Sequence, residues 1–154
     1  MTVVQISVEI EAPTDEVWAV VADPTNLSRW DHRIEGVEGL PSDGLHEGTT
    51  YRVKLRFVGA RASVPARVLE LRPQEYAKVH LGGLVNATVE TWVEPIGERR
   101  TRLRHRVDYR FRGGPLGGLA ARFVKIFGAP ILLRHGAEAQ KHHVEEMLRR
   151  RPRA

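Results

Sequence analysis

The sequence predicts an α+β fold in which one antiparallel sheet is covered by a long C-terminal helix. Apolar and polar residues alternate in a series of segments between residues 3 and 112, which is the periodicity of half-buried strands. After residue 113 the apolar residues fall instead at helical spacing. The chain has 154 residues and shows no linker or internal repeat, so we expect a single domain over 1–154, with frayed residues from about 150 to 154.

The N-terminal part is predicted to form one strand and two short helices. Residues 3–10 alternate strictly, and Pro13 ends this strand. A short helix then runs from Thr14 to about residue 22, with acidic residues in its first turn, where the helix dipole favours negative charge. Pro24 ends that helix, and residues 25–30 are expected to form a second short helical segment.

The middle of the chain is predicted to be an antiparallel meander. Segments with alternating residues are separated by Gly- and Pro-containing turns, and short turns of this kind join neighbouring antiparallel strands. The predicted strands cover residues 33–39, 50–57, 61–71, 75–82, 85–94 and 100–112. Together with residues 3–10 they make seven strands.

The last part of the chain is predicted to be mainly helical from residue 114 to about residue 149. Its apolar residues recur every three or four positions, and Pro130 is expected to break or bend the helix near residues 128–130. No other predicted element is long enough to cover the apolar face of the sheet. The space between a curved sheet and one helix is a common place for a ligand site.

The composition excludes several classes of site. The chain has no cysteine, which excludes disulfides, thiolate nucleophiles and cysteine-ligated metals. His135, His142 and His143 have no metal-ligand spacing, and no nucleotide or phosphate motif is present, so we expect neither a metal nor a cofactor. No apolar run approaches the roughly 20 residues of a membrane span, and the first residues alternate like a strand. A cytoplasmic location is therefore expected.

The charge distribution suggests a basic outer face. The formal net charge is +5, and the alternation places several arginines of two strands away from the core. These are Arg102, Arg104, Arg106, Arg110, Arg52 and Arg56. Such a face is either simply solvated or attracts an acidic carrier protein or an anionic membrane surface. Nucleic acid is not the expected partner, because no aromatic residues are interleaved with these arginines as stacking platforms.

The stretch TRLRHRVDYRF, residues 101–111, places a histidine on an apolar face. Alternation puts His105 inside, together with Leu103 and Tyr109, because the opposite phase would bury four arginines. Two interpretations remain open. His105 is either a core residue bonded to a neighbouring group, or an imidazole that contacts a ligand.

Three stretches resemble the START-like superfamily, in its polyketide cyclase/dehydrase and lipid-transport branch. They are EIEAPTDEVWAVVADPTNLSRW (9–30), ETWVEPIGERRTRLRHRVDYRF (90–111) and GGPLGGLAARF (113–123). The resemblance implies a helix-grip fold, in which a seven-stranded antiparallel sheet wraps around a long C-terminal helix with a cavity between them. It implies binding or transport of a small hydrophobic ligand, such as a lipid, a polyketide or a quinone-like molecule. The alternative is a polyketide cyclase, aromatase or dehydratase that acts on a poly-keto intermediate.

On this fold the ligand-binding residues are expected on the inner strand faces, at the end of the second short helix and on the C-terminal helix. They are Trp30, Tyr51, Val53, Leu55, Thr91, Leu103, His105, Val107, Tyr109, Phe123 and Phe127. If the protein is an enzyme, His105 and Tyr109 are expected to assist proton transfer.

Arg67 is a further candidate because of the same resemblance. In the aromatase/cyclases of the superfamily, an arginine on a middle strand is thought to hold a polyketide carbonyl or enolate. If Val64 and Val68 point inward, Arg67 points outward and that role fails. A bulge at Pro65 would reverse this phase.

Overall fold

The computed structural model describes residues 2–57, 60–83, 85–111 and 129–150, and its main element is a seven-stranded antiparallel sheet. The strands follow one another in space in the order β1-β7-β6-β5-β4-β3-β2. Their bounds are β1 (Thr2–Ile10), β2 (Ile34–Glu38), β3 (Thr50–Phe57), β4 (Ala60–Arg72), β5 (Tyr76–Leu81), β6 (Val85–Gly97) and β7 (Arg100–Phe111). The predicted meander from β2 to β7 is confirmed, and β1 joins it by pairing with β7.

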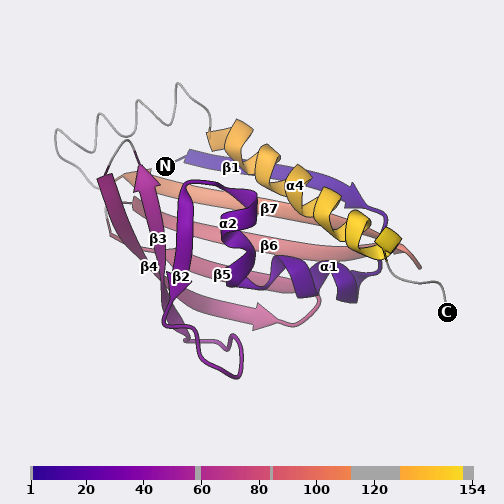
Figure 1. The fold of residues 1–154 in the computed structure, drawn as a ribbon, viewed down its shortest axis with the longest axis horizontal. Coiled ribbons are helices and arrows are strands. Elements are labelled where there is room, and N and C mark those ends of the chain that lie inside the picture. Colours follow the sequence, from indigo (N-terminus) through magenta and orange to yellow (C-terminus); the bar gives the residue numbers. More distant parts are fainter. Residues whose placement is uncertain (1, 58–59, 84, 112–128, 151–154) are drawn as a thin grey trace.

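The helices lie on one side of the sheet (Figure 1). They are α1 (Thr14–Val21), the 3-10 helix η1 (Pro24–Asn26), α2 (Leu27–Trp30) and α4 (Ala129–Arg150). The long helix α4 runs over β1 and β7, whereas α1 packs against β6 and β7, and α2 lies between β2 and α4. The predicted helix-grip fold is therefore confirmed. The expected helix over 114–128, together with Phe123, Phe127 and Gly128, lies outside the described residues. Ala129 and Pro130 of the expected break are the first two residues of α4.

The sheet is bent, which gives it a concave face toward the helices. Figure 1 shows β2, β3 and β4 running at a steep angle to β6 and β7. The register of β4 against β5 shifts between Val68 and Glu70, and Leu69 is left 45% exposed on the outer face. A bulge of this kind increases local twist and changes which residues face inward. Leu71 consequently takes the inner side.

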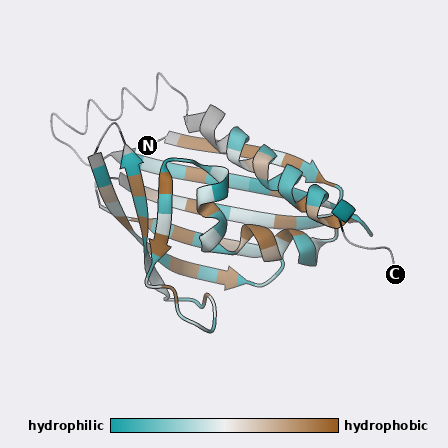
Figure 2. Ribbon diagram, viewed as in Figure 1, coloured by the Kyte–Doolittle hydropathy of each residue, from teal (hydrophilic) through white to brown (hydrophobic). Residues whose placement is uncertain are grey.

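Two groups of buried residues form the core at opposite ends of the concave face. One group joins β1, β6 and β7 to α1 and α4, and includes the fully buried Ile10, Val17 and Leu103. The other group is centred on β3 and β4, with Tyr51 and Val68 among its members. Figure 2 shows the cause, since brown apolar and teal polar residues alternate along the strands.

Candidate ligand cavity

A cavity of about 340 Å³ lies between the concave face of the sheet and the helices α1, α2 and α4. This volume falls in the usual range for small-molecule sites, roughly 300–1,000 Å³. The described residues in its wall are Trp18, Val21, Ala22, Pro24, Leu27, Trp30, Asp31, Ile34, Leu45, Tyr51, Val53, Leu55, Val64, Val68, Leu71, Ala77, Val79, Leu81, Val89, Thr91, His105, Gly136, Ala137 and Gln140. Most are aliphatic or aromatic, so the cavity suits an apolar occupant.

Cross-strand pairing builds the floor of the cavity in rows. Val68 of β4 pairs with Val79 of β5, which pairs with Val89 of β6, and all three border the cavity. The next row runs from Leu71 on β4 through Ala77 and Thr91 to His105 on β7. Side chains within a row lie directly beside one another, so each row presents a continuous surface.

His105 borders the cavity and is also fully hydrogen-bonded to the protein. Its Nδ1 lies 2.9 Å from Thr91 Oγ1, and its Nε2 lies 2.9 Å from Gln140 Oε1. Because the amide oxygen can only accept, Nε2 carries the proton and Nδ1 accepts from the Thr91 hydroxyl. The side chain is 7% exposed, and this burial lowers the pKa of His105, so the imidazole is neutral near pH 7. The structure thus supports the interpretation of His105 as a bonded core residue and also places it in the cavity wall, while its contact with a ligand stays a prediction.

Trp30 joins the short helix α2 to α4 at the edge of the cavity. Its indole ring meets the His143 ring edge-on, with 5.4 Å between the centroids. Gly136 of α4 lies opposite the Trp30 side chain, and a Cβ at that position would be only 4.0 Å from Trp30 Cβ. The indole Nε1 is buried and has no hydrogen-bond partner among the described residues. Trp30 therefore lines the cavity and also anchors α2 to α4.

A second hollow of about 510 Å³ adjoins the cavity. The two share the wall residues Trp18, Ala22, Pro24, Leu45 and Leu71. The second hollow also borders Leu40, Pro41, Ser42 and Gly44 of the segment that connects β2 and β3. The second hollow therefore lies between α1 and this segment, next to the cavity.

The structure places the candidate residues in three groups. Trp30, Tyr51, Val53, Leu55, Thr91 and His105 border the cavity. Leu103 does not, because it is fully buried in the core group that includes Val17 and Val93. Val107 and Tyr109 are half-buried and also lie outside the described wall. The structure therefore does not support a wall position for these three residues, and the ligand contacts of the other six remain predictions.

Gln140 is a wall residue that the sequence pattern did not single out. It is 7% exposed and shares the inner side of α4 with Ala137 and Val144, which are buried. These positions follow one another at intervals of three and four residues, so a polar residue interrupts the apolar stripe of the helix. This interruption is the sequence signal that could have pointed to Gln140. Its cause is visible only in the structure, where His105 lies opposite and forms a hydrogen bond with Gln140.

Arg67 points away from the cavity. It is exposed on β4, whereas its neighbours Ala66 and Val68 are buried and Val64 borders the cavity. The bulge in this strand lies beyond Val68 and not at Pro65, so it does not alter the phase at Arg67. The role of a cavity arginine is therefore not available to this residue.

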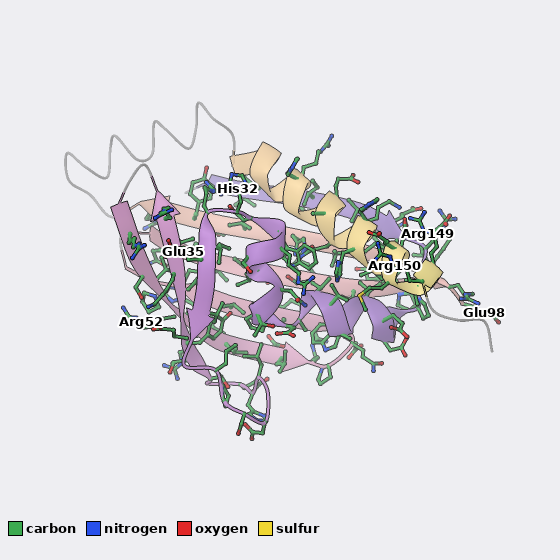
Figure 3. All side chains as sticks on the ribbon, viewed as in Figure 1. His32, Glu35, Arg52, Glu98, Arg149 and Arg150 are labelled. Atoms are coloured by element: carbon green, nitrogen blue, oxygen red, sulfur yellow. The ribbon has the colours of Figure 1, made fainter. Side chains whose placement is uncertain are left out.

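The arginines of the outer face are largely paired with glutamates. Arg106 contacts Glu90 at 3.1 Å, and Arg104 contacts Glu94 at 3.0 Å. The remaining pairs include Arg102–Glu9, Arg100–Glu9 and Arg56–Glu35, and Arg52 bonds to Ser63. Figure 3 shows Arg52 and Glu35 toward one end of the long axis and Arg149, Arg150 and Glu98 toward the other. Charges of both signs are thus spread over the molecule.

One aromatic residue does lie among these arginines, contrary to expectation. The guanidinium of Arg104 stacks over the Trp92 ring at 4.4 Å, and Tyr76 packs against the same ring at 5.3 Å between centroids. Both contacts join direct cross-strand partners. The Trp92 ring is therefore occupied by protein neighbours and offers no free stacking platform.

The sequence profile of the family described as "Polyketide cyclase / dehydrase and lipid transport" matches residues 1–145. The chain belongs to this family. A comparison with curated proteins gave no match.

In the part of the chain that the structure describes, no helix is long and apolar enough to cross a membrane. In the same part, no three His, Asp or Glu side chains are grouped so that they could hold a metal ion.

Several solved structures resemble this family member over nearly its whole length. TTHA0849 from Thermus thermophilus is 17% identical with a TM-score of 0.75, covering 95% of this chain and 99% of its own. The Zhui aromatase/cyclase from Streptomyces sp. R1128 is 22% identical with a TM-score of 0.72, covering 99% and 96%. A START superfamily protein from Mycobacterium smegmatis is 19% identical with a TM-score of 0.68, covering 94% and 98%. At these identities the likeness shows the fold alone.

Proposed function

We propose that this protein binds and carries a small hydrophobic molecule in the cavity between the sheet and α4. The observation that carries the proposal is the wall itself, which encloses about 340 Å³ and is built mostly from apolar side chains. Burying apolar ligand surface there stabilises the complex by roughly 25 cal/mol per Å² before the costs of association. Such a site needs no catalytic group in order to function.

The polar groups of the wall favour binding over catalysis. Both ring nitrogens of His105 are engaged by Thr91 and Gln140, so neither is free to contact a substrate. Tyr109, the other candidate for proton transfer, does not border the cavity. The two residues therefore do not form a joint acid–base pair facing one ligand.

A polyketide cyclase, aromatase or dehydratase activity is the second candidate, and one observation favours it. Burial lowers the pKa of His105, so a neutral imidazole lies in the wall at pH 7. A neutral imidazole can accept a proton if a substrate displaces the Thr91 hydroxyl from Nδ1. A substrate-dependent reaction that is lost in His105→Leu but retained in Tyr109→Phe would support this candidate.

A cavity-filling substitution tests the binding proposal. Val79 lies in the middle of the valine row, so Val79→Phe puts a ring into the cavity. The matched control is Leu69→Phe, which adds the same ring on the outer face of the neighbouring strand, where Leu69 is exposed. The probe is N-phenyl-1-naphthylamine, an uncharged dye that fluoresces in apolar surroundings. We expect at least tenfold weaker binding to folded Val79→Phe and unchanged binding to Leu69→Phe, and equal binding to both would contradict the proposal.

A further inference from the structure

The polar groups of the cavity wall differ in whether the protein already satisfies them. Thr91 and His105 are bonded to each other, and His105 is bonded to Gln140. The Asp31 carboxylate accepts from Arg33, with Nε at 2.9 Å and the backbone N–H at 3.0 Å. A ligand gains little from groups whose hydrogen bonds are already made.

Tyr51 differs from these groups. Trp30 Nε1 also lacks a partner among the described residues, but that atom is fully buried and is not accessible from the cavity, whereas the Tyr51 hydroxyl is not among the fully buried unpartnered atoms. The Tyr51 side chain is 7% exposed and borders the cavity, yet its hydroxyl has no hydrogen-bond partner among the residues that the structure describes. Buried phenols normally have a partner, because an unmade hydrogen bond costs free energy in an apolar site. Burial raises the pKa of Tyr51 to about 12, so the phenol keeps its proton and remains a donor at physiological pH. Its surroundings are apolar, since Val53, Ala66 and Val68 belong to the same buried group.

The wall also lacks an uncompensated charge. Its described residues include no lysine or arginine, and its one carboxylate, on Asp31, is paired with Arg33. His105 is neutral near pH 7 because burial lowers its pKa. A ligand carboxylate would therefore enter an apolar cavity without a counter-charge, which carries a large desolvation penalty. The amide nitrogen of Gln140 adds a second donor that has no partner among the described residues.

We infer that the cavity selects uncharged apolar molecules that carry a hydrogen-bond acceptor, such as a ketone or quinone carbonyl, and that the Tyr51 hydroxyl is the selecting donor. The inference rests on the proposed function, since it names the ligand class of the same cavity. Its physical basis is the combination of an unpartnered donor on a largely buried side chain in the cavity wall with a wall that offers an anion no free counter-charge. A plain hydrocarbon fits the apolar surface but leaves the Tyr51 hydroxyl unsatisfied.

Fluorene and 9-fluorenone test this inference, because the two rigid molecules differ by one carbonyl group. Their affinities are measured by displacement of N-phenyl-1-naphthylamine from the wild type, Tyr51→Phe and Tyr76→Phe. Tyr76→Phe is the matched control, since it removes a hydroxyl from the outer face, where Tyr76 donates to Glu90. We expect Tyr51→Phe to weaken 9-fluorenone binding about three- to tenfold and fluorene binding less than twofold. Tyr76→Phe should leave the ratio of the two affinities unchanged.

The charge part of the inference is tested with fluorene-9-carboxylate, which should bind the wild type at least tenfold more weakly than 9-fluorenone. An affinity ratio that survives Tyr51→Phe, or a carboxylate that binds as tightly as the ketone, would overturn the inference while leaving the binding function intact. If the dye, fluorene and 9-fluorenone all fail to bind the wild type, the proposed function fails and the inference fails with it.

Discussion

Nε2 of His105 lies 2.9 Å from Oε1 of Gln140, so a single buried hydrogen bond joins the last strand of the sheet to the C-terminal helix. The opposite ring nitrogen is bonded to Thr91 on β6, which makes His105 the centre of a three-residue chain. These two hydrogen bonds are directional, so together they fix the position of α4 along the sheet. It also defines one wall of the cavity.

The first prediction concerns the stability of this chain. His105→Leu should lower the free energy of unfolding by about 1–3 kcal/mol, because it leaves the buried Gln140 oxygen without a donor. Urea denaturation measures the effect. Adding Gln140→Leu should cost less than the sum of the two single changes, since an apolar pair replaces a bonded pair. A His105→Leu protein more stable than the wild type would contradict the prediction.

The second prediction concerns pH. The folded-state pKa of His105 lies below the unfolded value of about 6.5, because burial penalises the charged ring. The unfolded chain therefore binds the proton first, and the stability present above pH 6.5 is lost as the pH falls below that value. Between pH 7.5 and 5.5 the free energy of unfolding of the wild type should therefore fall more than that of His105→Leu. Parallel stability curves for the two proteins would show that His105 does not titrate in this way.

A third prediction concerns the junction of β7 with the turn before α1. The Thr101 side chain is fully buried, and its hydroxyl donates to the Ala12 carbonyl oxygen at 2.7 Å. Thr101→Val keeps the shape but leaves that carbonyl unsatisfied, so the free energy of unfolding should fall by about 1–3 kcal/mol. Thr101→Ser retains the hydroxyl and serves as the control. Thermal unfolding of the two variants distinguishes loss of the hydrogen bond from loss of the methyl group.

The fourth prediction concerns the outer face of the sheet. Because Glu90 and Glu94 pair with Arg106 and Arg104, the wild type should associate weakly with vesicles that contain an anionic phospholipid. The double change Glu90→Gln and Glu94→Gln frees two cations and should strengthen the association several-fold at low salt. Co-sedimentation measures it, with neutral vesicles as the control. Strong, salt-sensitive binding of the wild type would instead show that the paired arginines remain available to an anionic surface.

Period-two alternation made the strands predictable, because a strand with one buried face must place every second residue inside. The inward direction of His105 followed from that rule, since its neighbours Arg104 and Arg106 could not be buried. The same rule could not show which inward residues meet a ligand. Leu103 faces the core beneath α1, whereas His105, two residues along, faces the cavity. That difference depends on where the helices cross the sheet, which no local pattern encodes.

The ion pairs of the outer face were hidden for a related reason. The arginine stripe of β7 was visible in the sequence, but its partners come from other strands at matched register positions. Glu94 lies opposite Arg102 and reaches Arg104, and Glu9 lies opposite Arg102 on the other side. Arg100 and Glu9, which also pair, are separated by 91 residues in the chain. Pairing between distant strands sets these contacts, and charge patterns along one strand do not reveal it.

The pairing of β1 with β7 affects how the chain folds while the ribosome is still synthesising it. β1 has a single neighbour in the sheet, and that neighbour begins about 90 residues after β1 ends. At a synthesis rate of about 5–20 residues per second, β1 waits roughly 5–20 s before β7 has been made. During that interval its apolar side chains, including Ile6 and Val8, have no native strand beside them. The nascent chain therefore passes through a stage at which a chaperone has a hydrophobic segment to hold, and the cavity can close only after this stage is over.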